Sequence, residues 1–245
     1  MILRRAAAAY SFGLLFAGCQ DNPYTIGHFR DDLCATREQD LVCSGFEQPD
    51  LSDWGEQVLV NAGSLAQTEQ VSRRGRGALL AGSTDRDSAA AVAKEFSSVT
   101  SGSAFLRVFM LIPSGVETKT TNVLFLGDQP APDPFKGIDF NFESDAPEIF
   151  VPENDPVRFT STSLVVPRDR WFCFEADVLV SEAAGAVQIR IDGAVALDQT
   201  GLDTLPPQGV HLIRAGVDWS SKQTTPFAIY MDDLVLSAAP VGCGD

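Results

Sequence analysis

The sequence predicts an all-β protein folded as an antiparallel sandwich. From residue 44 onward, apolar or alternating runs of about five to ten residues recur, and clusters of Gly, Pro, Asp, Asn and Ser separate them. No segment carries a 3.6-residue apolar stripe long enough to predict a helix. A dozen or so short strands with no helices between them indicate two packed antiparallel sheets. The chain length fits one domain of this kind.

The boundaries of the first strands come from turn residues. Run 89–96 is rich in Ala, as many helices are, but turn-like Ser and Asp residues precede it and two serines follow it, so we expect a strand. Run 103–112 ends at a Pro-Ser-Gly turn, and run 121–126 stops at Gly-Asp. Run 137–142 alternates, so its isoleucine and two phenylalanines share one face.

The second half of the chain carries the clearest strands. Run 171–180 is long and rich in β-formers, and run 186–192 alternates Val and Ile with polar residues. Asp192-Gly193 then predicts a tight hairpin into run 194–197. Two further strands are expected at 210–219 and 227–236.

The first residues are typical of an export signal. Two arginines precede an apolar run at 6–16, which is too short to cross a bilayer, and Ala-Gly-Cys19 follows it. This end resembles the bacterial lipobox, although Phe16 departs from the usual Leu, Val or Ile. The resemblance implies a signal peptide at 1–18 and a lipid on Cys19. The alternative is a plain secretory signal that ends near a cysteine.

The lipid would set the layout of the mature protein. Two or three acyl chains hold a protein to a membrane far more firmly than one. Gln20, rather than Asp, follows the cysteine, which resembles sorting signals for the outer membrane. Residues 19–42 lack periodicity and are expected to form a lipidated tether, and residues 43–245 the sandwich. We therefore expect a membrane-anchored protein of the cell envelope.

The net charge limits the classes of binding partner, and the cysteine count predicts the disulfides. The formal net charge of −15 argues against nucleic acid and favours cations such as calcium. If Cys19 is lipidated, four cysteines remain, and an even number in an exported protein predicts two disulfides. Three pairings are open, and we favour Cys34–Cys43 with Cys173–Cys243. Metal binding by these cysteines is not expected, since no CxxC pair occurs.

Several strand sequences, in their order, resemble those of laminin-G-like, concanavalin-A-like jelly rolls. The resemblance covers about residues 43 to 243 and implies a jelly-roll β-sandwich. This fold includes lectins, adhesion modules, glycanases and lyases, so it does not settle function. The similar segments are Gly45-Phe46-Glu47 with Trp54 after it, the Gly-x-Gly-Ala-Leu run at 75–79, the Trp-x-Cys-x-Glu run at 171–175 with 187–193, Tyr230 to Val235, and Gly242-Cys243.

The resemblance implies a structural calcium site. Related jelly rolls clamp Ca²⁺ between an acid of the first strand and acids of the last strand, which correspond here to Glu47 and to Asp232 or Asp233, with Asp50 as a further oxygen donor. Adjacent acids on a strand point to opposite faces, so only one of Asp232 and Asp233 is expected to enter the site, with Asp233 favoured. The alternative is an ordinary edge of acidic residues in an acidic protein.

A glycan platform is the second expectation, because aromatic faces stack on sugar rings. Most aromatic residues of a sandwich belong to its core, so each candidate has to be tested separately. Phe135 comes first, since it ends a Pro-rich loop that can line a rim. Trp54 and Trp219 are the other candidates.

No catalytic residues are predicted. Glu175-Ala176-Asp177 places two acids on one strand face, but Val180 stands where glucanases of this fold carry a third. His211 is expected on the outer face of a strand rather than as a base. We expect a monomeric, surface-anchored lipoprotein with a lectin-like domain that binds glycan or a cell-surface protein. The alternatives are a divergent polysaccharide hydrolase or lyase, which would depend on Glu175 or His211, and a structural envelope protein.

Overall fold

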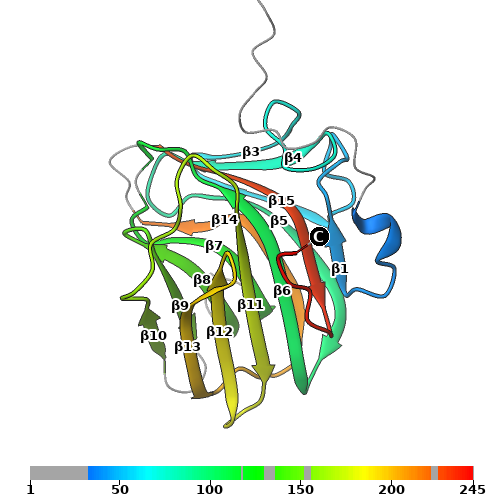
Figure 1. Cartoon of the computed structure of the whole chain (residues 1–245), viewed down its shortest axis with the longest axis vertical. Helices are drawn as coiled ribbons and strands as arrows, with labels where there is room; N and C mark the ends of the chain where they lie inside the picture. Colours follow the sequence, from blue (N-terminus) through cyan, green and yellow to red (C-terminus); the bar gives the residue numbers. More distant parts are fainter. Residues whose placement is uncertain (1–32, 117, 130–135, 152–155, 222–225, 245) are drawn as a thin grey trace, which may run out of the picture.

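The computed structural model describes residues 33–116, 118–129, 136–151, 156–221 and 226–244, and these form a sandwich of two antiparallel sheets (Figure 1). The predicted fold class is confirmed. The helix of the described residues is a single 3-10 turn, η1 (Leu33–Thr36). Within the same residues, no helix is long and apolar enough to span a membrane.

Sheet A has eight strands and lies in front in Figure 1. Its order is β13 (Ala194–Leu202), β12 (Gly185–Ile191), β11 (Phe172–Val180), β6 (Gly102–Leu111), β15 (Phe227–Ser237), β4 (Ala78–Ser83) and β3 (Gly63–Thr68), and β1 (Val42–Ser44) pairs with β15.

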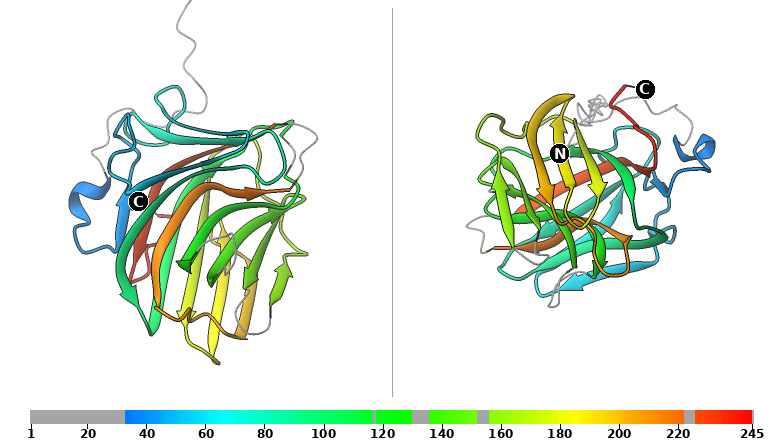
Figure 2. Two further views of the ribbon diagram at one scale, coloured as in Figure 1. Left: turned by 180° about the vertical axis from the view of Figure 1, so that it is seen from behind. Right: turned by 90° about the horizontal axis from the view of Figure 1, so that it is seen from below.

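Sheet B has seven strands and faces the viewer in the left view of Figure 2. Its order is β10 (Val157–Thr160), β9 (Ala146–Val151), β8 (Lys136–Glu143), β7 (Thr121–Gln129), β14 (Val210–Ser220), β5 (Ala89–Val99) and β2 (Glu56–Val60). The last two strands of the chain each pair between strands from much earlier in the chain: β14 between β7 and β5 in sheet B, and β15 between β6 and β4 in sheet A.

The core fills the space between the sheets. Phe140 of β8 meets Phe174 of β11 edge to face, with ring centroids 5.9 Å apart, and both side chains are fully buried. In β14, Ile213 and Ala215 point into this core, so the residues between them point outward. This alternation defines the outer face of sheet B.

All nine predicted strand segments are strands, including the Ala-rich run, which is β5. The sequence analysis missed β2, β3, β9 and β10. Three of these are edge strands, and four of the five residues of β2 are exposed, so this strand has no buried face to produce an alternating pattern. The first strand is β1 (Val42–Ser44), so Gly45-Phe46-Glu47, which resembled a first strand in sequence, follows it instead of forming it.

The two disulfides have the pairing that we favoured. Cys34–Cys43 ties η1 to β1. Cys173–Cys243 ties the C-terminal segment to β11 on the outer face of sheet A, where a small second apolar cluster surrounds it. The chain therefore returns to cover one face of the sandwich after its last strand (Figure 1).

Candidate functional site

One row of side chains crosses the whole outer face of sheet B. The strand pairings place one residue from each of the seven strands in the row, at right angles to the strands. Because the flanking positions belong to the core, this row lies on the outside. Its members, in order, are Glu56, Ala93, Arg214, Phe125, Asp139, Phe150 and Arg158.

A second row runs beside the first on the same face. It is displaced along the strands, and irregular register between Ala215 and Trp219 in β14 sets its start. Its members are Trp219, Asn122, Asn141, Glu148 and Thr160. Four of these five side chains are polar, which is unusual for a surface where Asn122, Asn141 and Glu148 are buried.

Phe125 lies buried at the middle of the first row. Its ring lies over the backbone of two paired glycines, Gly127 and Gly137. A Cβ at Gly127 would come within 2.6 Å of the ring, and one at Gly137 within 2.7 Å. The two glycines thus let an outward-facing phenylalanine lie flat and become fully buried.

Two ion pairs flank the centre of the rows. Arg214 donates to Asp218 at 2.7 Å within β14. On the other side, Arg158 pairs with Glu148, and its guanidinium lies 5.0 Å from the centroid of the Phe150 ring. Glu148 also accepts from Thr160 Oγ1 at 2.7 Å and from Asn141 Nδ2 at 3.2 Å.

Asp139 lies between these two pairs. Its carboxylate accepts a hydrogen bond from Asn122 Nδ2. Burial raises the pKa of Asp139 well above its usual range, and the nearby Asp218 raises it further, against smaller opposing effects of Asn122, Arg158 and Arg214. Burial also raises the pKa of Asp218, and Arg214 partly offsets this.

Two polar atoms at this centre have no hydrogen-bond partner among the described residues. They are Asn122 Oδ1, an acceptor, and Arg214 Nε, a donor. Asn122 is only 3% exposed, so its oxygen is poorly placed to bond to bulk water. An unsatisfied buried polar atom costs about 1–3 kcal/mol, and a bound ligand can remove that cost.

A groove of about 630 Å³ continues the first row toward β2. Arg214 is shared between the groove and the polar centre, so the two form one surface. Lys94 donates to the Asp53 carbonyl at 2.7 Å at one side of the groove. The groove is lined by Ser52, Asp53, Trp54, Gly55, Glu56, Ala93, Lys94, Glu95, Leu212 and Arg214.

The three aromatic candidates have different outcomes. Trp54 is poorly placed for stacking on a sugar: it is 5% exposed, stacks on Phe46 at 5.6 Å and donates its indole N–H to Ser44. Its ring therefore belongs to the core and reaches the groove only with an edge. Trp219 lies in the second row, half-buried, with its N–H donated to Asp87 at 2.9 Å. Phe135, like Cys19, lies outside the described residues.

Three of the four acids expected at the calcium site converge on one turn. Glu47 accepts from the backbone N–H groups of Arg76 and Gly77. Asp232 accepts from the backbone N–H groups of Arg73 and Arg74, and Asp233 pairs with their guanidinium groups. Asp50 is exposed and accepts from Ser52 instead.

The expectation that Asp232 and Asp233 point to opposite faces is wrong. Asp233 has a positive φ of 52°, and the register of β15 is irregular after Asp232, so the strand alternation is interrupted there. Both carboxylates reach the turn at 73–77. The calcium hypothesis stays a prediction, and melting curves with excess calcium and with chelator test it.

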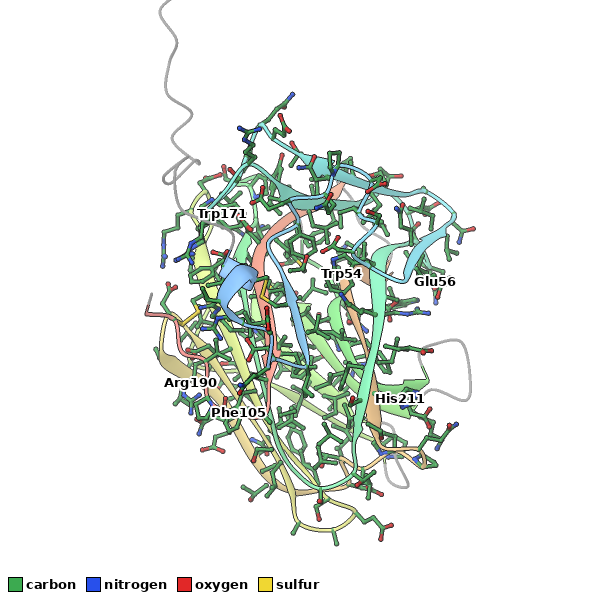
Figure 3. All side chains as sticks on the ribbon, turned by 90° about the vertical axis from the view of Figure 1, so that its right-hand side faces the viewer. Trp54, Glu56, Phe105, Trp171, Arg190 and His211 are labelled. Atoms are coloured by element: carbon green, nitrogen blue, oxygen red, sulfur yellow. A yellow bond between two sulfur atoms is a disulfide. The ribbon has the colours of Figure 1, made fainter. Side chains whose placement is uncertain are left out.

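The two residues named for a hydrolase or lyase lie far apart in the fold. Glu175 is on the outer face of sheet A, with its Oε2 2.9 Å from Cys243 Sγ, and burial raises its pKa. His211 belongs to β14 of sheet B, where Nδ1 lies 3.1 Å from the Gly209 carbonyl. Figure 3 shows Arg190, the cross-strand neighbour of Glu175, and His211 on opposite sides of the sandwich.

Sequence reasoning missed the centre of the site. Asp139 and Asn141 are the polar positions of the predicted alternating strand 137–142, and this outward alternation was the available signal. The proximity of these two residues to Arg214 and Asn122 depends on the cross-strand register, which local sequence does not specify.

Comparison with known proteins identifies the fold but no family. No family model matches the chain, and no curated protein matches it. Among solved structures, it is similar to an endo-β-1,4-glucuronan lyase from the fungus Trichoderma reesei, with a TM-score of 0.63 and 13% identity over 77% of this chain and 92% of that one.

Two further structures agree. The cellulose-induced protein Cip1 has a TM-score of 0.61 and 13% identity over 83% of this chain and 100% of that one. The alginate lyase Aly36B has a TM-score of 0.51 and 14% identity over 79% and 91%. At such identities the likeness concerns the fold alone: the chain shares the two-sheet β-sandwich of these proteins.

Proposed function

We propose that this protein binds glycans and holds an oligosaccharide across the outer face of sheet B. The observation that carries the proposal is the pair of cross-strand rows, which combine Trp219 and Phe150 with hydrogen-bonding side chains. Aromatic faces with fixed polar groups beside them are suited to sugar rings and their hydroxyls. Solved structures of similar fold include proteins named as polysaccharide lyases, which supports a carbohydrate-related role.

The size of the face fits an oligomer rather than a single sugar. Seven strands contribute to the first row, and at roughly 4.8 Å between strands a row of this kind extends about 29 Å. The groove between β2 and β14 forms one end of the row, and Arg158 of β10 marks the other.

The surface role depends on the lipid. The N-terminal sequence supports attachment of the protein to the cell envelope, and to the outer membrane, through acylated Cys19. Mass spectrometry of the mature protein tests this part. An uncleaved chain that begins at Met1 and carries no lipid would contradict it and leave the glycan proposal standing.

Trp219→Ala tests the binding face. In a glycan panel followed by calorimetry, we expect this variant to lose about 1 kcal/mol, or about fivefold in affinity, for any sugar that binds the natural protein. Phe105→Ala is the matched control, because Phe105 is a half-buried aromatic residue on the outer face of sheet A. Equal losses in both variants would show that the sugar does not bind at sheet B.

A hydrolase is the second candidate, and Asp139 is the observation that favours it. Glycoside hydrolysis needs one protonated carboxyl group and one ionised carboxylate. Asp139 has a raised pKa and lies close enough to Asp218 for the two charges to interact. Release of sugar from a bound polysaccharide, abolished in Asp139→Ala, would establish this activity, and binding without release would exclude it.

A further inference from the structure

We infer that the outer face of sheet B recognises an uncharged oligosaccharide, and that Asp139 donates a hydrogen bond to one of its hydroxyls. This inference rests on the proposed function and adds the ligand class to it. A neutral ligand would differ from glucuronan and alginate, the acidic polymers in the names of the similar lyases.

The first argument is charge. A site for a uronic acid needs a cation that is free to pair with the sugar carboxylate. Here Arg214 is paired with Asp218, and Arg158 with Glu148. Asp139 then adds a carboxyl group between the two pairs, with Asn122 as its hydrogen-bond donor. The centre of the face therefore has no positive charge left over from its described residues.

The groove end of the row is no more cationic. Lys94 lies at its side, but Glu56 and Glu95 line the same groove. The chain as a whole carries a formal net charge of −15, so a polyanionic sugar is repelled before it reaches the surface. Both the local and the overall charge favour a neutral ligand.

The second argument is hydrogen-bond chemistry. At the centre, the acceptor Asn122 Oδ1 and the donor Arg214 Nε have no partner among the described residues, and both atoms are buried. A hydroxyl group both donates and accepts, so the hydroxyls of a neutral sugar can satisfy both atoms once the two side chains turn toward it. A carboxylate only accepts and would leave the Asn122 oxygen buried without a partner.

Protonation of Asp139 completes the arrangement. The groups that face it are Arg214 and Asp218 of β14, Asn122 of β7, Glu148 of β9 and Arg158 of β10. Burial and Asp218 raise its pKa, which favours the neutral carboxyl group. In that form Asp139 can donate to the sugar, and this donation is lost as the pH rises through the raised pKa.

Calorimetry with two ligand series tests the inference on the full chain. The neutral series contains cello-, xylo-, manno- and laminari-oligosaccharides, and the acidic series contains oligoglucuronates and oligomannuronates of matched length. We expect binding within the neutral series, weakening as the pH rises, and none within the acidic series. Tighter binding of an acidic oligosaccharide would overturn the inference alone, whereas no binding in either series would overturn the proposed function with it.

Two variants of Asp139 separate hydrogen bonding from packing. Asp139→Asn keeps a donor and cannot ionise, so we expect its affinity to stay near the low-pH value of the natural protein and to lose its pH dependence. Asp139→Leu removes the donor, and we expect about a tenfold loss of affinity at low pH. If Asp139→Leu binds the sugar as tightly as Asp139→Asn while circular dichroism shows both variants folded, Asp139 does not contact the sugar.

Discussion

The outer faces of sheets A and B both carry arginines, acidic residues and aromatic residues, but these residues make different contacts on the two faces. On sheet A, Arg107 is fully buried and lies near the Gly242 and Asp233 carbonyls, and Arg73 lies 3.3 Å over the Phe109 ring. The turn at 73–77 and the C-terminal segment cover this face. On sheet B, a comparable set of arginines, acids and aromatics crosses the strands in rows of buried and partly exposed side chains.

The comparison teaches that residue type alone does not separate a structural cluster from the proposed binding face. Asp232 and Asp233 of sheet A bind donors from their own chain. On sheet B, the donor Arg214 Nε and the acceptor Asn122 Oδ1 have no partner in the described part of the protein. The partly exposed members of the rows on sheet B, such as Trp219 and Asp139, are the positions where a ligand can make contact.

The largest expected loss of stability comes from removing the disulfide that holds the C-terminal segment on sheet A. Replacing Cys173 and Cys243 together by Ser removes a bridge across a sequence separation of 70, and the chain-entropy model gives a loss of about 4 kcal/mol. The matched control replaces Cys34 and Cys43, whose separation is 9, with an expected loss of about 2.5 kcal/mol. Denaturant titration measures both, and a larger loss in the control would contradict the assignment of the long bridge as the main staple.

Asp233→Ala should have the next largest effect. It removes the partner of Arg73 and Arg74, and breaking a buried ion pair costs about 3 kcal/mol, or about 6–12 °C in melting temperature for a protein of this size. Asp233→Asn is the milder control, because Asn tolerates the positive φ of 52° better than Ala. Glycan affinity should be unchanged in both, and a parallel loss of affinity would mean that the two faces are coupled.

Asp139→Asn should have the smallest effect on stability, and it should stabilise the protein where the other variants destabilise it. The pKa of Asp139 is raised in the folded protein, so ionisation above that pKa costs stability. Asn avoids this cost. We expect the variant to melt at a higher temperature than the natural protein at neutral pH, with the gain disappearing as the pH falls to the ordinary Asp value of 3.8. Asp198→Asn, at an exposed position of sheet A, should show no such gain.

The fold was predictable because burial leaves a local pattern. Strands with one buried face, such as β8 and β12, alternate in sequence, and Asp192-Gly193 gives the hairpin between β12 and β13. The edge strand β2 is exposed along most of its length and leaves no such pattern. The sequence resemblance singled out Asp232 and Asp233 of the last strand, but it did not indicate that both would be buried.

The site was less predictable because it depends on register. Asp139 comes within electrostatic range of Arg214, across Phe125, only because β8, β7 and β14 pair in one particular alignment. Sequence alone likewise does not predict whether a tryptophan lies in the core or on an outer face. Trp54 stacks against Phe46, whereas Trp219 lies in the second row. Side-chain type narrows the candidates, and long-range pairing decides between them.

The bridge at Cys243 also fixes how the molecule can be attached to a support. It holds the chain end on the outer face of sheet A, and sheet B forms the other layer of the sandwich. An affinity tag placed after the last residue therefore orients captured molecules with sheet B toward the solution. Sensor surfaces prepared in this way leave both rows accessible to large polysaccharides.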